Sequence, residues 1–211
     1  MRTRLLFIIT IALIPAINCN VGINRTIYID DGEKVRGSQN TVNGSIIIGS
    51  DCEVGGDCRS VNGDIEVGEN SNVRSLQAVN GRIRLEKDVT VRGDIEAINM
   101  RILCSPGVKI EGEVYSVNGK IDLDNTTVSK NVSTYNGDII LSGRSRINGD
   151  IIIRRNRGEH QHRRSLTIEI ADGSVVEGDV IVRDRDIEVT VYLMNGGKVE
   201  GKIVDAEVVE R

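Results

Sequence analysis

One short phrase, an apolar residue followed by Asn and Gly, returns through most of the chain at a nearly constant interval. Successive copies start 18 or 19 residues apart: Val42-Asn43-Gly44, Val61-Asn62-Gly63, Val79-Asn80-Gly81, Ile98-Asn99-Met100, Val117-Asn118-Gly119 and Tyr135-Asn136-Gly137. A fixed, short period is typical of stacked structural units, each of which contacts only its neighbours. The chain is therefore expected to form a solenoid.

Two further apolar columns run between the copies of this phrase. One contains Ile29, Ile48, Val67, Leu85, Cys104, Leu123 and Leu141, and the other contains Val35, Val54, Val73, Val91, Ile110, Val128 and Ile147. Counting the apolar residue of the phrase, each period has three anchors about six residues apart, with strand-like alternation between them. This pattern predicts an all-β, triangular, parallel β-helix with 18–19 residues per coil and three inward-facing anchors.

The Asn-Gly pair predicts a sharp corner in each coil. Glycine is needed where φ is positive, and asparagine tolerates the same region. In parallel, in-register coils the aligned asparagines are also expected to stack as a ladder of hydrogen-bonded amides. The members of this predicted ladder are Asn43, Asn62, Asn80, Asn99, Asn118 and Asn136.

The start of the chain has the pattern of a secretory signal peptide. Arg2 and Arg4 precede an apolar run from Leu5 to Ile17 that is shorter than the roughly 20 residues of a membrane-spanning helix. We therefore expect export to the periplasm or outer envelope, with either a lipid anchor at Cys19 or cleavage after Ala16. The predicted divisions are a signal peptide (1–18), regular coils (19–153), a basic loop (154–164) and irregular C-terminal coils that cap the same domain (165–211).

Composition limits the classes of partner. The formal net charge is −4, and it becomes −6 without Arg2 and Arg4, which argues against a general nucleic-acid surface. The chain has no Trp and its single Phe lies in the leader, so small branched residues must fill a narrow interior.

Five corner phrases carry a family resemblance. V-N-G-D-I, V-R-G-D-I, I-E-G-E-V, V-E-G-D-V and V-E-G-K-I resemble the coils of bactofilins, a polymer-forming cytoskeletal family, over about residues 35–204. The chain looks most like exported bacterial relatives of that family. The resemblance implies a right-handed β-helix and self-assembly, whereas period and spacing alone also suit the left-handed helix of hexapeptide acyltransferases.

Two groups of residues are candidate sites. The basic cluster of Arg154, Arg155, Arg157, Arg163 and Arg164 is suited to gripping phosphate or carboxylate groups of an envelope polymer, and a solvated loop is the alternative. Cys52 and Cys58 align with inward positions on either side of a corner, where an exported protein can form a disulfide. No catalytic residue, cofactor or metal site is predicted, because Glu159, His160 and His162 are too few for a closed zinc site.

The leading functional hypothesis is a non-enzymatic structural or scaffold protein of the bacterial cell envelope. Its partners would be copies of itself, as homo-oligomer or filament, or an envelope component, since stacked coils present open strand edges. One alternative is a periplasmic or surface module that binds an anionic polymer through the arginines. The other is a β-helix enzyme acting on carbohydrates or acyl groups.

Overall fold

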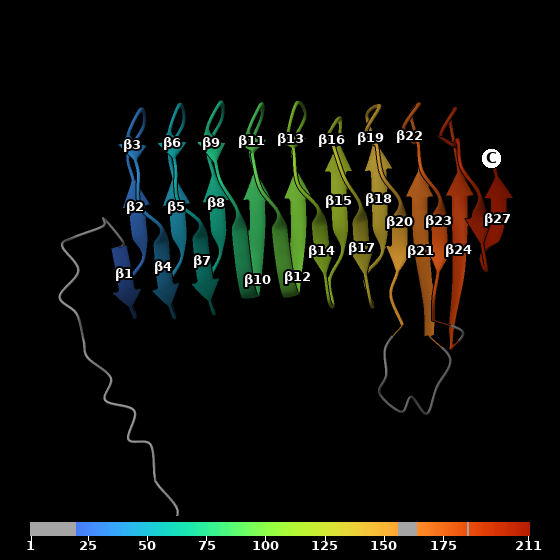
Figure 1. Cartoon of the computed structure of the whole chain (residues 1–211), viewed down its shortest axis with the longest axis horizontal. Helices are drawn as coiled ribbons and strands as arrows, with labels where there is room; N and C mark the ends of the chain where they lie inside the picture. The colour runs from blue at the N-terminus through green and yellow to red at the C-terminus, as the bar shows by residue number, and fades with distance from the viewer. Residues whose placement is uncertain (1–19, 156–163, 185) are drawn as a thin grey trace, which may run out of the picture.

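The computed structural model describes residues 20–155, 164–184 and 186–211 as a solenoid of parallel strands. These ranges contain β-strands and no helix, and they form about nine turns of about 19 residues each. At about 4.8 Å between neighbouring strands, nine turns make a rod about 40 Å long. Figure 1 shows the turns side by side along the long axis of the molecule. The predicted β-helix is confirmed.

Three stacks of strands make the faces of the rod. The first face consists of β1 (Asn20–Ile23), β4 (Gln39–Val42), β7 (Cys58–Val61), β14 (Val114–Ser116), β17 (Val132–Thr134), β20 (Ile151–Ile153), β23 (Val180–Val182) and β26 (Ile203–Val204). The second face consists of β2 (Ile27–Ile29), β5 (Ile46–Ile48), β8 (Ile65–Val67), β15 (Ile121–Asp124), β18 (Ile139–Ser142), β21 (Arg164–Ile170), β24 (Ile187–Leu193) and β27 (Glu207–Glu210). Two longer strands, β10 (Leu76–Leu85) and β12 (Ile95–Cys104), run through both faces.

The third face consists of two-residue strands. They are β3 (Lys34–Val35), β6 (Glu53–Val54), β9 (Asn72–Val73), β11 (Thr90–Val91), β13 (Lys109–Ile110), β16 (Thr127–Val128), β19 (Arg146–Ile147), β22 (Val175–Val176) and β25 (Lys198–Val199). Matched rungs therefore pair backbone groups that a single coil would leave unpaired.

Two of the three predicted anchor columns are buried. The column from Ile29 to Leu141 lines the inside of the second face, and the column from Val54 to Ile147 lines the third. Val35, in the second of these columns, is only partly buried.

The third predicted column is wrong, because the apolar residue of the repeated phrase faces outward. Val42 and Val61 are 42% and 39% exposed, while their neighbours Thr41 and Ser60 are buried. In these two rungs the hydroxyl of the buried residue satisfies a backbone carbonyl at the corner. Thr41 Oγ1 donates to the Arg25 carbonyl at 2.7 Å, and Ser60 Oγ donates to Gly44 at 2.9 Å.

The corner between the first and second faces, hereafter the Asn corner, divides its requirements between two residues. Asn43, Asn62 and Asn80 hold φ at 54°, 57° and 56°. The glycines that follow do not carry the positive φ expected for them. A Cβ on Gly63 would instead lie 1.9 Å from the Gly44 carbonyl oxygen of the preceding rung. In these rungs asparagine supplies the left-handed conformation, and glycine allows the rungs to approach; Asn118 and Asn136, in later rungs, do not have a positive φ.

The basic segment leaves the rod at the Asn corner, between β20 and β21. The rod continues across it in register, because β21 pairs with β18 and β23 pairs with β20. The strands β21 and β24 then have seven residues each. The predicted signal peptide and Cys19 lie outside the described residues, as do Arg157, Arg163, Glu159, His160 and His162.

The expected disulfide between Cys52 and Cys58 is not formed. Both side chains point inward as predicted, yet each carries a free, buried thiol, as does Cys104. Cys58 lies in β7, whereas the Cys52 thiol is turned towards the preceding rung, where it donates to the Asp30 carbonyl at 3.1 Å. The two sulfur atoms are therefore held in different environments.

Candidate functional site

A ladder of asparagine side chains follows the Asn corner along the rod. Each Nδ2 donates to the Oδ1 of the preceding member, at distances of 2.6 to 3.2 Å, from Asn43 through Asn62, Asn80, Asn99, Asn118 and Asn136. The structure brings all six predicted members together. It adds Asn24, which accepts from Asn43 at 2.9 Å. Asn24 lies 19 residues before Asn43, and it was missed because Arg25 stands where the phrase has glycine.

Arg164 ends this ladder. The next position in register, Arg155, replaces the asparagine, and the guanidinium of Arg164 reaches back so that Nη1 donates to Asn136 Oδ1. The Nε and Nη2 atoms of Arg164 are buried, and neither has a hydrogen-bond partner among the described residues. An unsatisfied buried donor destabilises a fold by about 1–3 kcal/mol, so these two donors are a local cost to stability.

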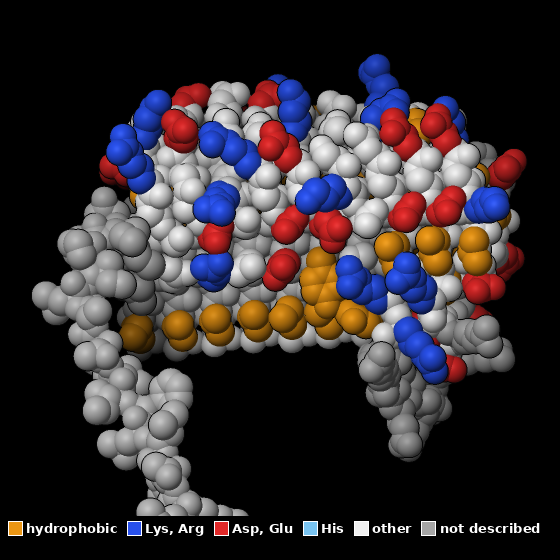
Figure 2. Space-filling model, in the orientation of Figure 1, with side chains coloured by type: hydrophobic (Ala, Val, Ile, Leu, Met, Phe, Trp, Pro, Cys, Tyr) orange, Lys and Arg blue, Asp and Glu red, His pale blue; other side chains and the backbone are white. Residues whose placement is uncertain are grey.

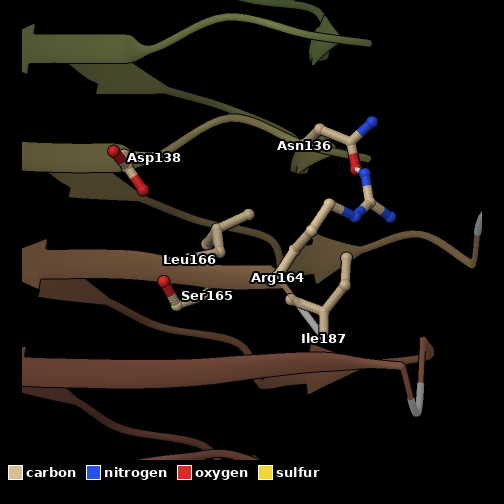
Figure 3. Close-up of a pocket in the computed structure, with 6 residues that line it drawn as sticks. All are labelled: Asn136, Asp138, Arg164, Ser165, Leu166 and Ile187. Carbon is tan, nitrogen blue, oxygen red and sulfur yellow. Dashed lines mark hydrogen bonds between the residues drawn. The ribbon is translucent and has the colours of Figure 1, made fainter. Parts of the chain in front are cut away.

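A pocket of about 420 Å³ adjoins this guanidinium. Its lining residues are Asn136, Asp138, Arg164, Ser165, Leu166 and Ile187. Figure 3 shows Asp138 and Ser165 towards one end, the Arg164–Asn136 pair and Ile187 towards the other, and Leu166 between them. One Asp138 oxygen accepts the backbone N–H of Thr167 at 2.9 Å, which fixes the carboxylate in place.

The predicted arginine cluster is not one continuous surface in the described residues. Arg154 lies 4.9 Å above the Tyr115 ring, and its Nε donates to Ser133 Oγ at 3.1 Å. It also shares a shallow pocket of about 290 Å³ with three acids, Asp94, Glu96 and Glu113, and with Tyr115. Arg155 is exposed. Arg154 therefore serves local packing, and Arg164 alone combines a pocket with unsatisfied donors in the described part of this cluster.

Tyr115 and Tyr135 form an aromatic pair beside Arg154. Their ring centroids are 6.1 Å apart with an interplanar angle of 74°. Burial raises the pKa of Tyr115, the neighbouring Tyr135 acts in the same direction, and Arg154 opposes both. Edge-to-face aromatic contacts of this kind are favourable.

An apolar stripe runs beside the ladder on the outside of the first face. Its members are the first residues of each corner phrase: Ile23, Val42, Val61, Val79, Ile98, Val117 and Tyr135. Ile23 is 72% exposed and Ile98 is 39% exposed. Figure 2 shows the stripe as an unbroken row of hydrophobic side chains along the lower edge of the molecule. The sequence analysis predicts these residues as core anchors, and the structure places them on the outside.

Acidic residues of the corner phrases have structural contacts. Asp94 Oδ1 accepts the backbone N–H of Glu113 at 2.8 Å, and Asp150 and Asp179 do the same for the next rung at 2.8 and 2.7 Å. These carboxylates satisfy backbone donors at another corner. No group of three or more His, Cys, Asp and Glu side chains is placed to hold a metal ion within the described ranges.

The chain matches no protein-family model, no curated protein and no solved structure. No helix with the length and hydropathy of a membrane span occurs in the residues that the structure describes.

Proposed function

We propose that this protein is a structural scaffold of the bacterial cell envelope, a rod that associates side by side with copies of itself. The observation that carries the proposal is the apolar stripe, which places an outward-facing hydrophobic side chain at seven successive rungs. Four of them are exposed, and Val79, Val117 and Tyr135 are half-buried. An exposed apolar row of this length marks an interaction surface. The spacing between stripe residues of neighbouring rungs, about 4.8 Å, is the same in a second copy, so two stripes can lie in register.

The charges beside the stripe favour two parallel rods related by a two-fold axis along their length. In each rung of this arrangement, the residue two positions before the stripe residue of one copy faces the residue three positions after the stripe residue of the other copy. Arg59 faces Asp64, Glu96 faces Arg101, and no like charges meet. The antiparallel arrangement centred on Val79 would instead place Arg82 against itself. These charges are exposed surface groups, so exchanging an internal partner for an external one costs little.

The contact is expected to be weak for a single pair. Six rung spacings of about 4.8 Å give the stripe a length of about 29 Å, and five residues of strand give a width of about 16 Å. The footprint of about 450 Å² per copy is roughly half of what a standard interface buries. Association should therefore depend strongly on concentration, as is useful when many rods assemble on an envelope surface.

Sedimentation velocity over a concentration series tests this proposal with two matched variants. Val42→Asp places a charge in the stripe, and Val208→Asp places the same charge at a valine that is equally exposed, at 43%, in the last described rung. The proposal expects Val42→Asp alone to abolish association. A wild-type protein that stays monomeric at high concentration would refute it, and loss of association only in Val208→Asp would move the contact to the end of the rod.

A second candidate function is a module that binds an anionic envelope polymer. It is favoured by the pocket beside the guanidinium of Arg164 rather than by the arginine cluster as a whole. Polymer binding that survives loss of this one guanidinium would remove the support for it.

A further inference from the structure

The chain contains seven Asn-Gly sequences, and their side chains lie in different environments. Asparagine followed by glycine is chemically labile, because glycine has no Cβ to hinder attack of its backbone nitrogen on the asparagine side chain. Two of the seven are Asn148-Gly149 and Asn195-Gly196. The other five belong to the ladder, at Asn43, Asn62, Asn80, Asn118 and Asn136.

Each of these five ladder amides is held at both ends. The Nδ2 atom donates to the preceding asparagine, and the Oδ1 atom accepts from the next donor along the rod, which for Asn136 is Arg164. Ring closure requires the side chain to rotate until Cγ meets the nitrogen of the following residue, so both bonds must first break. Breaking two bonds of ordinary strength slows the reaction by roughly tenfold to a hundredfold.

Asn148 has neither of these restraints. Its side chain is exposed and makes no hydrogen bond within the described residues. Its backbone is fixed like that of other rungs, because Asn148 N donates to the Val128 carbonyl at 2.9 Å. The side chain of Asn148 is therefore free to rotate on an ordered backbone. Asn195 is intermediate, since its Nδ2 donates to Asp172 Oδ1 at 3.1 Å.

We propose that Asn148 is a site of spontaneous deamidation in the native rod, and that the ladder protects the five Asn-Gly sequences within it. The Gly149 nitrogen bonds to Asn148 Cγ, and its proton leaves with Nδ2 as ammonia. Water then opens the succinimide ring to aspartate or isoaspartate, so the reaction needs no oxidant or reductant. This chemical role of the ladder goes beyond the scaffold proposal and does not depend on rod association.

The product at Asn148 would disturb the neighbouring rung. Aspartate adds a negative charge at a position that lies in register with Glu177. Isoaspartate lengthens the backbone next to Gly149, where a Cβ would already lie 2.4 Å from Asn131 Oδ1. Because this oxygen accepts the Asp150 N–H at 2.9 Å, isoaspartate should weaken the contact between the two rungs.

The test is incubation of the native protein at mildly alkaline pH, followed by peptide mass spectrometry of every Asn-Gly sequence. We expect Asn148 to deamidate roughly tenfold to a hundredfold faster than the five ladder asparagines, and all of them to react at similar rates in urea. Asn148→Ser should abolish the fast reaction and leave the others unchanged. Ladder asparagines that react as fast as Asn148 in the native protein would overturn the proposal.

Asn99→Gly tests the ladder itself. Asn99 is an inner member followed by Met100 rather than glycine, and glycine tolerates its φ of 57°. The change removes one bond from Asn80 and one from Asn118 but no Asn-Gly sequence. Deamidation at these two should rise roughly threefold to tenfold, while Asn43 stays unchanged. Unchanged rates at both would overturn the protective role. If Asn43 also accelerates, the rod has loosened as a whole, and the wild-type comparison decides.

Discussion

Replacement of Gly63 by alanine should destabilise the rod by a steric effect between rungs. The new Cβ would lie 1.9 Å from the Gly44 carbonyl oxygen and 2.5 Å from its carbon, so the rungs must separate locally by more than 1 Å. Two inter-rung hydrogen bonds flank this point, Asn43 N to Val61 O at 2.7 Å and Ile46 N to Asp64 O at 2.9 Å. Each contributes about 0.5–1.5 kcal/mol.

Loss of both bonds, with some residual strain, predicts a decrease of about 3 kcal/mol in the free energy of unfolding. For a chain of this size that lowers the melting temperature by about 6–12 °C. Gly55 is the matched control, because a Cβ there would meet its nearest atom, the Arg36 carbonyl oxygen, at an ordinary 3.5 Å. Gly55→Ala should stabilise the protein by about 0.4–1 kcal/mol.

Urea denaturation followed by circular dichroism measures both variants. Equal stability of Gly63→Ala and Gly55→Ala would refute the reasoning, because the two changes alter the unfolded chain in the same way. The difference between them isolates the close approach of the rungs.

Two further predictions concern the ladder and the buried thiols. Asn80→Ala should lower the free energy of unfolding by about 1–3 kcal/mol more than Asn118→Ala in the same urea assay. Both variants lose ladder bonds, but only Asn80 of the two has a positive φ, of 56°. Equal losses would contradict the conformational role of Asn80. Burial raises the pKa of Cys58 to about 12, and Asp57 adds to this effect, so the native thiol should resist a disulfide reagent at pH 8 until the chain unfolds. Because the thiol of the unfolded chain ionises first, the contribution of Cys58 to the free energy of unfolding should be complete below pH 9.0 and should fall as pH rises towards about 12. Rapid labelling of Cys58 in the native protein would contradict its burial.

The fold could be predicted because one period governs the whole chain. Matched rungs require the same residue types at the same positions, so the buried columns through Leu85 and Val91 and the asparagine ladder were visible as aligned letters. The orientation of the corner valines was not predictable from hydrophobicity alone. Alternation within β4 decides it: Gln39 and Thr41 point inward although they are polar, because hydroxyl and amide groups bond to the backbone there.

The candidate site could be predicted only as a charge cluster. The sequence shows five arginines of equal status, whereas the structure assigns Arg154 to an aromatic ring and Arg164 to the end of the ladder. That difference depends on how the chain returns to the rod at β21, which no local pattern specifies. The pocket likewise combines β21 with Asp138 and Ile187 from neighbouring rungs.

Small-angle X-ray scattering over a concentration series tests the proposed side-by-side association most directly. A single rod is about 40 Å long. The account predicts that higher concentration increases the cross-sectional radius of gyration while the rod length stays nearly constant, and that Val42→Asp keeps the single-rod cross-section. Growth in length at constant cross-section, or no change at any concentration, would contradict it.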